Sequence, residues 1–227
     1  MGKAQVGQPA AGSPPGAQRF ACGSIRQSNE LLILAAAERV FAGAGFSGAT
    51  MAQIATVADL PKANLHYYFG NKEGLYRAVL ARILDDWLAP THGITADADP
   101  RTAIEGYIRS KMALSATRPH ASKVWANELL HGAAVVKQLL ATALRETVGA
   151  KAAVIDHWIA RGLMQPVDST HLFFTIWAAT QTYADFDVQV CAVLGREALS
   201  AADHTRATEH VVAMLLRGCG LNGVQAD

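Results

Sequence analysis

The sequence predicts an all-α protein with about nine helices, and two observations lead to that prediction. Between proline breaks the apolar residues recur at intervals of three and four, as in the stripe Leu75, Val79, Ile83 and Trp87. No stretch of the sequence alternates apolar and polar residues in the way that a half-buried strand does. The chain has 227 residues, of which 51% are hydrophobic, and this is sufficient for a substantial core.

Composition excludes several classes of protein. Charged residues make up 17% of the chain and the net charge is +1, so any contact with nucleic acid must come from a local patch. Cys22, Cys191 and Cys219 are too widely spaced for a disulfide framework or a zinc signature, which favours a reducing compartment. The longest apolar run, Leu31–Ala37, is shorter than a membrane span, and the N-terminus lacks a signal-peptide core. We expect a soluble cytoplasmic protein without membrane segments.

The first segment, residues 1–27, is expected to be a flexible arm because its prolines, glycines and small polar residues bury little surface. Ser28 can cap a helix that stops at Gly43-Ala44-Gly45. Residues 43–48 also match the dinucleotide pattern G-x-G-x-x-G, but such a site needs a strand before its glycines. We therefore interpret these glycines as a helix stop with a left-handed cap.

Two short helices separated by a three-residue turn are predicted next. Thr50 and Gln53 have the spacing of a capping box that opens a helix over about residues 51–57. Asp59 tolerates the left-handed backbone that the turn requires, and Pro61 suits the start of a helix over residues 62–68. This order of elements is a helix-turn-helix, which we assign to a domain of residues 28–72.

The second short helix carries an unusual outward face. Leu65 and Phe69, four residues apart, face inward. The residues left facing outward are Lys62, Ala63, Asn64, His66 and Tyr67. Amides pair with adenine edges and rings pack on thymine methyl groups, so this face suits the major groove of DNA. The alternative is a surface helix whose tyrosines cover the edge of a core.

Asn71 caps the helix that follows, which we expect to run to about Leu88. Lys72 lies near its amino end, where backbone amides favour a phosphate group. Residues 73–218 are assigned to a larger helical domain, in which Leu139 to Ile159 marks a second long helix. Residues 219–227 are expected to form a flexible tail.

The segment of residues 172–186 is apolar nearly all round, as expected of a helix that is covered on several sides. Trp177 and Gln181 share one face of it, and a buried amide needs hydrogen-bond partners. The sequence leaves two interpretations open: a bond from Gln181 to another helix or subunit, or a flat polar ligand held by Gln181 and stacked on Trp177. Trp125, Asn127 and Trp158 are further lining candidates, although large aromatic residues more often belong to a core.

Catalysis finds no support in the sequence. Glu128 and His131 have the Glu-x-x-His spacing of di-iron bundles, but no second pair of this kind follows. His66 has no Ser, Cys or carboxylate partner at motif spacing, and neither a nucleophile elbow nor a phosphate loop is present in the sequence. We expect no enzymatic activity, no metal and no cofactor.

From Gly45 to Tyr76 the chain resembles the DNA-binding domain of the TetR family of bacterial repressors. The residues that carry this resemblance are Phe46, Ser47, Thr50, Ile54, Ala55, Ala58, Leu60, Lys62, Leu65, Tyr67, Tyr68, Phe69, Lys72, Glu73 and Leu75. The resemblance implies that Thr50, Tyr67, Tyr68 and Lys72 contact double-stranded operator DNA, mostly at phosphates, while the helix of residues 62–67 reads bases. Family members usually have Gly where Asp59 stands and Ser or Thr where Pro61 stands, so we expect the turn to survive without its side-chain cap.

The remaining chain resembles one branch of that family, the regulators of pyrimidine utilisation that sense uracil and thymine. The resemblance lies in the blocks of residues 87–90, 107–109, 121–122, 128–130, 177–178 and 183–186. It implies that Trp87 and Gln181 contact a pyrimidine, with Trp177 nearby. A regulator of another aromatic or hydrophobic ligand is the alternative, followed by an all-α small-molecule binder or enzyme without a DNA function.

A homodimer is also expected, because one chain offers little to cover so apolar a helix as that of residues 168–187. This helix and a last one over residues 203–218 would form a four-helix interface between two subunits. Phe174, Ile176 and Tyr183 fall on faces that Trp177 and Gln181 do not use, and we assign them to the interface.

Overall fold

The computed structural model describes residues 15–221, and the all-α prediction is confirmed for this part of the chain. The prediction of a flexible arm falls partly on residues 1–14, which lie outside the described residues, as do residues 222–227 of the expected tail. The elements, in order, are α1 (Pro15–Gly48), α2 (Met51–Ala58), α3 (Lys62–Phe69), α4 (Lys72–Leu88), the 3₁₀ turn η1 (Ala89–Gly93), α5 (Pro100–Thr117), α6 (Pro119–Leu130), α7 (Lys137–Leu139), the π-helical turn η2 (Leu140–Leu144), α8 (Arg145–Ala160), α9 (Ser169–Asp185), α10 (Asp187–Leu194) and α11 (Ala201–Gly218).

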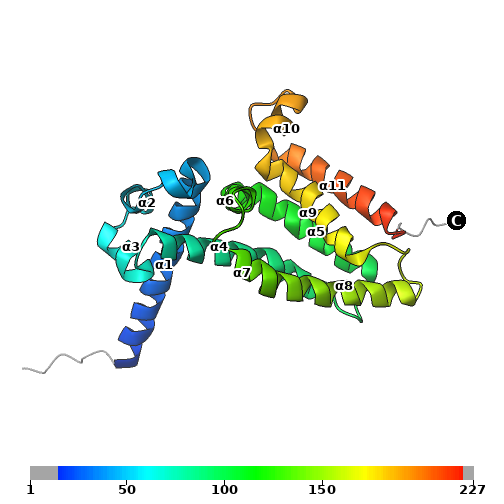
Figure 1. Ribbon diagram of the computed structural model, residues 1–227, viewed down its shortest axis with the longest axis horizontal. Coiled ribbons are helices and arrows are strands. Elements are labelled where there is room, and N and C mark those ends of the chain that lie inside the picture. The colour runs from blue at the N-terminus through cyan, green and yellow to red at the C-terminus, as the bar shows by residue number, and fades with distance from the viewer. Residues whose placement is uncertain (1–14, 222–227) are drawn as a thin grey trace, which may run out of the picture.

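The helices gather into two groups joined by α4 (Figure 1). Helices α1 to α3 form the smaller group, and α5, α8, α9 and α11 form the larger one, with α10 projecting at its edge. Two apolar cores correspond to these groups, and the first core extends along α4 into α6. Because α6 packs on α1 as well as on α9, the two groups are in direct contact.

Helix α1 differs from its prediction at its start. It begins at Pro15 instead of Ser28, so residues 15–27 are helical rather than part of an arm. Proline suits the first turn of a helix, where its missing N–H has no helical partner to lose. The break near the other end lies at Gly45, with φ 66° and ψ 176°, within the predicted stop at residues 43–45. Glycine adopts a positive φ without steric cost, which explains why the chain turns there.

Within the described part of the chain, one helical segment, Arg26–Gly48 of α1, is long and apolar enough to cross a membrane. This judgement rests on its length and composition only. Ile33, Ala37 and Phe41 of this helix are buried in the first core, against α2 and α4. We therefore interpret its apolar character as that of a core helix.

The predicted turn chemistry of the helix-turn-helix is confirmed. The Thr50 hydroxyl accepts a hydrogen bond from the Gln53 N–H at 3.2 Å, and the Gln53 side chain accepts one from the Thr50 N–H at 3.0 Å. Asp59 ends α2 with a left-handed backbone, φ 53° and ψ 44°. Pro61 precedes α3 without a side-chain cap, as the departure from the family pattern led us to expect.

The junction between α3 and α4 depends on a close backbone approach. The Asn71 side chain accepts a hydrogen bond from the Gly74 N–H at 2.8 Å and so caps α4. A Cβ atom at Gly74 would lie 2.3 Å from the carbonyl oxygen of Phe69, closer than real contacts allow. Glycine at this position therefore lets α4 start directly against the end of α3, and this fixes the angle between the two helices.

Polar contacts tie α1 and α4 to the start and end of α6. Arg118, at the junction of α5 and α6, pairs with Glu38 of α1 and with Asp86 of α4. The Tyr76 hydroxyl donates to the Glu128 carboxylate at 3.1 Å, and burial together with this carboxylate raises the pKa of Tyr76 above its usual value. Glu128 also accepts a hydrogen bond from the Val135 N–H at 2.6 Å, so its carboxylate is fully engaged in structure.

The larger group encloses the second core. Its largest fully buried side chains include Trp158, Tyr107, Phe173 and Ile104. Two residues assigned to a flexible tail belong to it as well, because Cys219 and Leu221 are buried there. The expectation of a tail from residue 219 onward is therefore wrong for residues 219–221.

The long helix expected between Leu139 and Ile159 is present but not uniform. It consists of α7, η2 and α8 in direct succession, and η2 (Leu140–Leu144) is a π-helical turn. Such turns occur mostly as single-turn bulges within α-helices, frequently at functional sites. The sequence pattern predicts the helix but carries no signal for its wider turn.

Candidate functional site

Helix α3 presents the outward face that the sequence predicts. Leu65 is fully buried beneath the helix, whereas 73% of the Tyr67 side chain is exposed. Lys62, Ala63 and His66 are exposed, and so is Thr50 at the start of α2, while Asn64 and Tyr68 are half-buried. The rings of Tyr67 and Tyr68 meet edge to face, with their centres 5.2 Å apart.

Two of the residues predicted to bind DNA make internal contacts. A ring nitrogen of His66, Nδ1, lies 2.8 Å from the Gly70 carbonyl oxygen at the end of α3. The Lys72 ammonium donates to the carbonyl oxygens of Phe46 at 2.8 Å and of Ala49 at 3.0 Å, and it lies 4.6 Å from the centre of the Phe46 ring. Lys72 thus holds the end of α1 in place, a role that the sequence could not reveal because its partners are more than twenty residues away.

Helix α1 adds a cation beside the outward face. The Arg26 guanidinium lies 5.9 Å from the centre of the Tyr67 ring, within the range of a cation–π contact. Arg26 was predicted to belong to the arm. The earlier start of α1 brings it next to α3, and the positive charge near this face is therefore larger than the sequence analysis suggested.

A small cavity of about 90 Å³ lies where the two cores meet. Four residues predicted to bind a ligand line it together, namely Trp87, Trp125, Trp177 and Gln181. They come from α4, α6 and α9, and the remaining wall is formed by Leu84, Leu88, Tyr107, Lys111, Leu129, Leu140 and Leu144. The wider turn η2 supplies the last two of these residues.

Aromatic rings from both cores line the cavity. The rings of Trp87 and Trp125 meet edge to face, 5.5 Å apart, and both are buried in the first core. The Trp177 indole N–H donates to the Tyr107 hydroxyl at 2.7 Å, on the side of the second core. Burial raises the pKa of Tyr107 to about 12, so its hydroxyl is un-ionised at neutral pH. A flat ligand in this cavity would contact both cores at once.

Two polar side chains face this apolar site. The Gln181 amide makes no hydrogen bond to any of the residues that the structure describes, although it is half-buried. The other is Lys111, which is 2% exposed and whose Nζ lies 4.1 Å from the centre of the Trp87 ring. Sequence analysis missed Lys111. Its position four residues after Tyr107, on the same helix face, is the signal that would have found it.

Three predicted site residues lie elsewhere. Asn127 lines a different hollow beside the end of α1, because it is two positions past Trp125 and so faces another side of α6. Ile176, assigned to a dimer interface, is fully buried in the second core of its own subunit. Trp158 is likewise a core residue, and its indole N–H donates to the Ala96 carbonyl at 3.3 Å.

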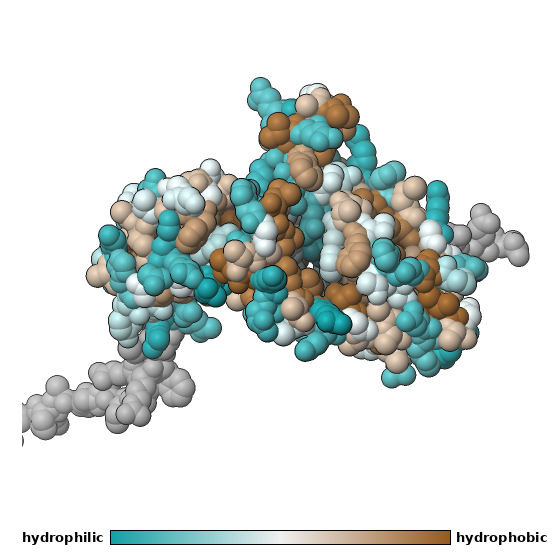
Figure 2. Space-filling view, in the orientation of Figure 1, coloured by the Kyte–Doolittle hydropathy of each residue, from teal (hydrophilic) through white to brown (hydrophobic). Residues whose placement is uncertain are grey.

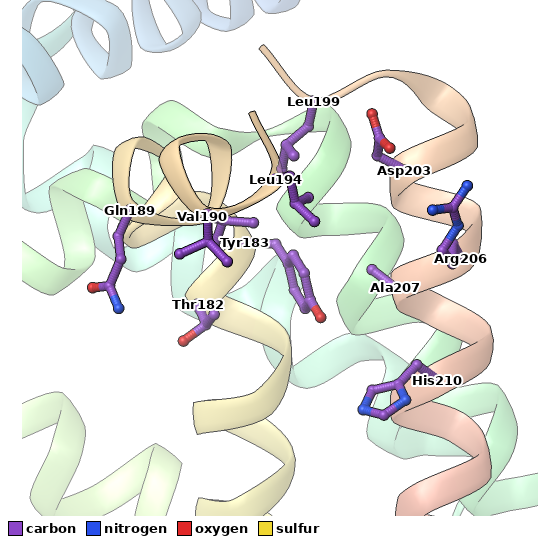
Figure 3. Close-up of a pocket in the computed structure, with 11 residues that line it drawn as sticks. Thr182, Tyr183, Gln189, Val190, Leu194, Leu199, Asp203, Arg206, Ala207 and His210 are labelled. Carbon is purple, nitrogen blue, oxygen red and sulfur yellow. The ribbon is translucent and has the colours of Figure 1, made fainter. Parts of the chain in front are cut away.

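The other two residues assigned to an interface lie on the surface. Phe174 on α9 is 46% exposed. Tyr183 lines an open groove of about 400 Å³ between α9, α10 and α11, and its ring lies between the turns of α10 and α11 (Figure 3). Brown side chains gather on α10 beside this groove (Figure 2), where Val188 and Val193 are about four-fifths exposed.

Comparison with known proteins agrees with this architecture. The profile "Bacterial regulatory proteins, tetR family" matches residues 33–79, and the profile "YcdC-like protein, C-terminal region" matches residues 80–222. The HTH-type transcriptional regulator RutR of Escherichia coli strain K12 is 41% identical over 186 residues, which cover 82% of this chain and 88% of that protein. The repressor NicS of Pseudomonas putida is 31% identical over 148 residues, covering 63% of this chain and 70% of NicS.

Solved structures show the same fold at lower identity. The ketosteroid regulator KstR2 of Mycobacterium tuberculosis superposes with a TM-score of 0.66 at 16% identity, covering 84% of this chain and 94% of that one. AibR in complex with isovaleryl coenzyme A and operator DNA gives a TM-score of 0.60 at 18% identity, covering 82% of this chain and 97% of AibR. The helix-turn-helix, the helical C-terminal domain and the two profile matches together show that this chain belongs to the TetR family of bacterial DNA-binding transcriptional regulators, which are not enzymes.

Proposed function

We propose that the chain is a cytoplasmic repressor whose affinity for its operator is lowered by uracil or thymine bound in the cavity between the two cores. The observation that carries this proposal is the convergence of Trp87, Trp177 and Gln181 on one small cavity. These are the residues that the resemblance to pyrimidine-utilisation regulators implies for the ligand. By the same resemblance, the regulated genes serve pyrimidine and nitrogen metabolism.

The size of the cavity favours a single-ring ligand over the alternatives. Pockets for drug-sized molecules usually measure about 300–1,000 Å³, whereas this one measures about 90 Å³. Tryptophan rings in the lining provide stacking surfaces, and the Gln181 amide can pair with a neighbouring N–H and C=O of a flat ring. A larger hydrophobic effector would require the walls to move apart.

The proposed mechanism uses the position of α4. Its 17 residues span about 25 Å at 1.5 Å per residue, from Lys72 beside the DNA-binding face to Trp87 in the cavity wall. A pyrimidine stacked on Trp87 and bonded to Gln181 would fix this end of α4 against the second core. The ligand shifts DNA affinity only to the extent that it prefers one position of α4 over the other.

The proposed DNA contacts can be separated by mutation. Tyr67→Ala or Asn64→Ala should reduce discrimination between operator and random DNA, because α3 is the base-reading element of this proposal. Fluorescence anisotropy with both DNAs over a range of salt concentrations measures this. Leu130→Ala, at an exposed site on α6, is the matched control. An equal loss of affinity for both DNAs would assign these side chains to phosphates instead.

Lys72 requires a separate experiment, because its ammonium already binds the end of α1. If Lys72 contacts a phosphate, Lys72→Ala weakens binding to all DNA sequences. It also flattens the slope of log affinity against log salt concentration by about one unit. If Lys72 serves only to bind the end of α1, the substitution lowers the melting temperature of the protein and leaves this slope unchanged. We propose the phosphate contact, and an unaltered slope would exclude it.

A homodimer is proposed on the exposed faces of α9 and α11, extended by α10. Phe174→Glu should give a monomer in sedimentation velocity at micromolar concentration, because it places a charge on this apolar face. Leu130→Glu, at a more exposed position on α6, should leave the dimer intact. In such a dimer the two α3 helices would meet half-sites about 34–36 Å apart. A wild-type monomer under these conditions would contradict the proposal.

A further inference from the structure

Lys111 is a buried cation that the fold itself does not use. It is 2% exposed, and a lysine is almost never fully buried unless it has a partner. The groups acting on it within the described chain are the Trp87 ring at 4.1 Å and the more distant charge of Asp185, and it has no hydrogen bond there. The side chain lines the cavity together with Gln181 and Trp177. Its ammonium therefore has no acceptor among the described residues, in a side chain that lines the site.

The electrostatics add to this geometric observation. Burial lowers the pKa of Lys111 to about 8, and the Asp185 carboxylate opposes that shift. The Asp185 carboxylate is itself engaged by the Ser122 hydroxyl. Near neutral pH the amine is therefore mainly protonated but poorly solvated, and an oxygen acceptor entering the cavity would replace the hydration that it has lost.

The two polar residues make different demands on a ligand. A glutamine amide carries donors and an acceptor, so Gln181 can pair with the adjacent N–H and C=O of a lactam. A lysine ammonium carries donors only, so Lys111 needs a separate oxygen. A ring that satisfies both must therefore offer a lactam edge and a second carbonyl oxygen.

We propose that Lys111 is the specificity-determining residue of the cavity and donates to a second ring carbonyl. The site thereby selects cyclic imides and ureides, such as uracil, over rings that carry one lactam carbonyl, such as 2-pyridone. This inference rests on the proposed function, since it takes the cavity to be the effector site.

The test pairs one substitution in the protein with one change in the ligand. Lys111→Met removes the ammonium, while its thioether can still pack against the Trp87 ring. Isothermal titration calorimetry measures uracil and 2-pyridone against wild type and variant. Wild type should bind uracil about 10- to 100-fold more tightly than 2-pyridone, the contribution of a hydrogen bond to a charged group. The variant should lose most of this preference, chiefly by weaker binding of uracil.

The outcomes distinguish this inference from the proposed function. Equal affinities of wild type for the two ligands would overturn the role of Lys111 whether or not the variant folds. An unchanged preference in a folded Lys111→Met protein, judged by circular dichroism against Lys137→Met as control, would overturn it as well. Wild type that binds neither ligand would remove the pyrimidine assignment itself, and the proposed role of Lys111 with it.

Discussion

Gln181→Leu should abolish the response of operator affinity to uracil while leaving binding of ligand-free protein to DNA unchanged. Leucine fits the apolar wall but cannot pair with a lactam edge, and Gln181 lies on α9, outside the helix-turn-helix. In wild type we expect uracil to lower operator affinity about 5- to 150-fold, the usual range of coupling between two sites. This is the largest functional effect that the structure leads us to expect.

Titrating uracil against protein–operator complexes measures the response directly. Gln138→Leu, an exposed glutamine on α7 that does not line the cavity, is the matched control and should respond like wild type. By linkage, operator DNA should weaken uracil binding by the same factor, which calorimetry with and without DNA can check. A preserved response in Gln181→Leu would refute the role of this residue, and an unresponsive wild type would refute the pyrimidine assignment.

Arg118→Met should give the largest loss of stability among exchanges of charged residues. The substitution leaves the carboxylate of Glu38, a residue that is 7% exposed, without its cation between α1 and α6. Breaking a buried pair costs about 3–5 kcal/mol, and the partial exposure of Arg118 lowers our expectation to about 2–3 kcal/mol. Urea denaturation followed by circular dichroism gives this free energy.

An exposed ion pair supplies the control for this experiment. Arg77→Met breaks a pair with Glu73 in which both side chains are more than half exposed, and it should cost about 0–1 kcal/mol. Adding Glu38→Gln to Arg118→Met should restore part of the loss, because the isolated charge is then removed. If Arg118→Met and Arg77→Met lower the free energy of unfolding equally, the ion pairs of Arg118 between α1, α4 and α6 contribute no more to stability than an exposed ion pair.

The sequence predicts the helix-turn-helix closely because its signals are local. Thr50 and Gln53 lie three residues apart, and Asp59 determines the turn by its own backbone preference. The start of α1 was misjudged because composition pointed to an arm, while the proline at position 15 is compatible with a first helical turn.

The errors and omissions at the site have a different cause. Helix α9 is apolar nearly all round, so its pattern could not show that Ile176 faces its own subunit. The contacts of Lys72 and the burial of Lys111 depend on residues far away in the chain. Trp87 is predicted through resemblance alone, whereas Gln181 is also predicted from its place on an apolar helix. Their common cavity became visible only when α4, α5 and α9 were placed together.

The π-helical turn η2 gives the ligand cavity a simple route of evolutionary change. A π turn closes its hydrogen bonds over five residues instead of four, so it accommodates one residue more than the α-helix on either side. Deleting one residue there would restore a regular helix and leave the residues on either side in register, because the π turn takes up its extra residue locally. The backbone between Leu140 and Leu144, which both line the cavity, would then be shorter by one residue while α8 kept its packing. A single insertion or deletion can thus reshape this pocket without a change to the fold around it.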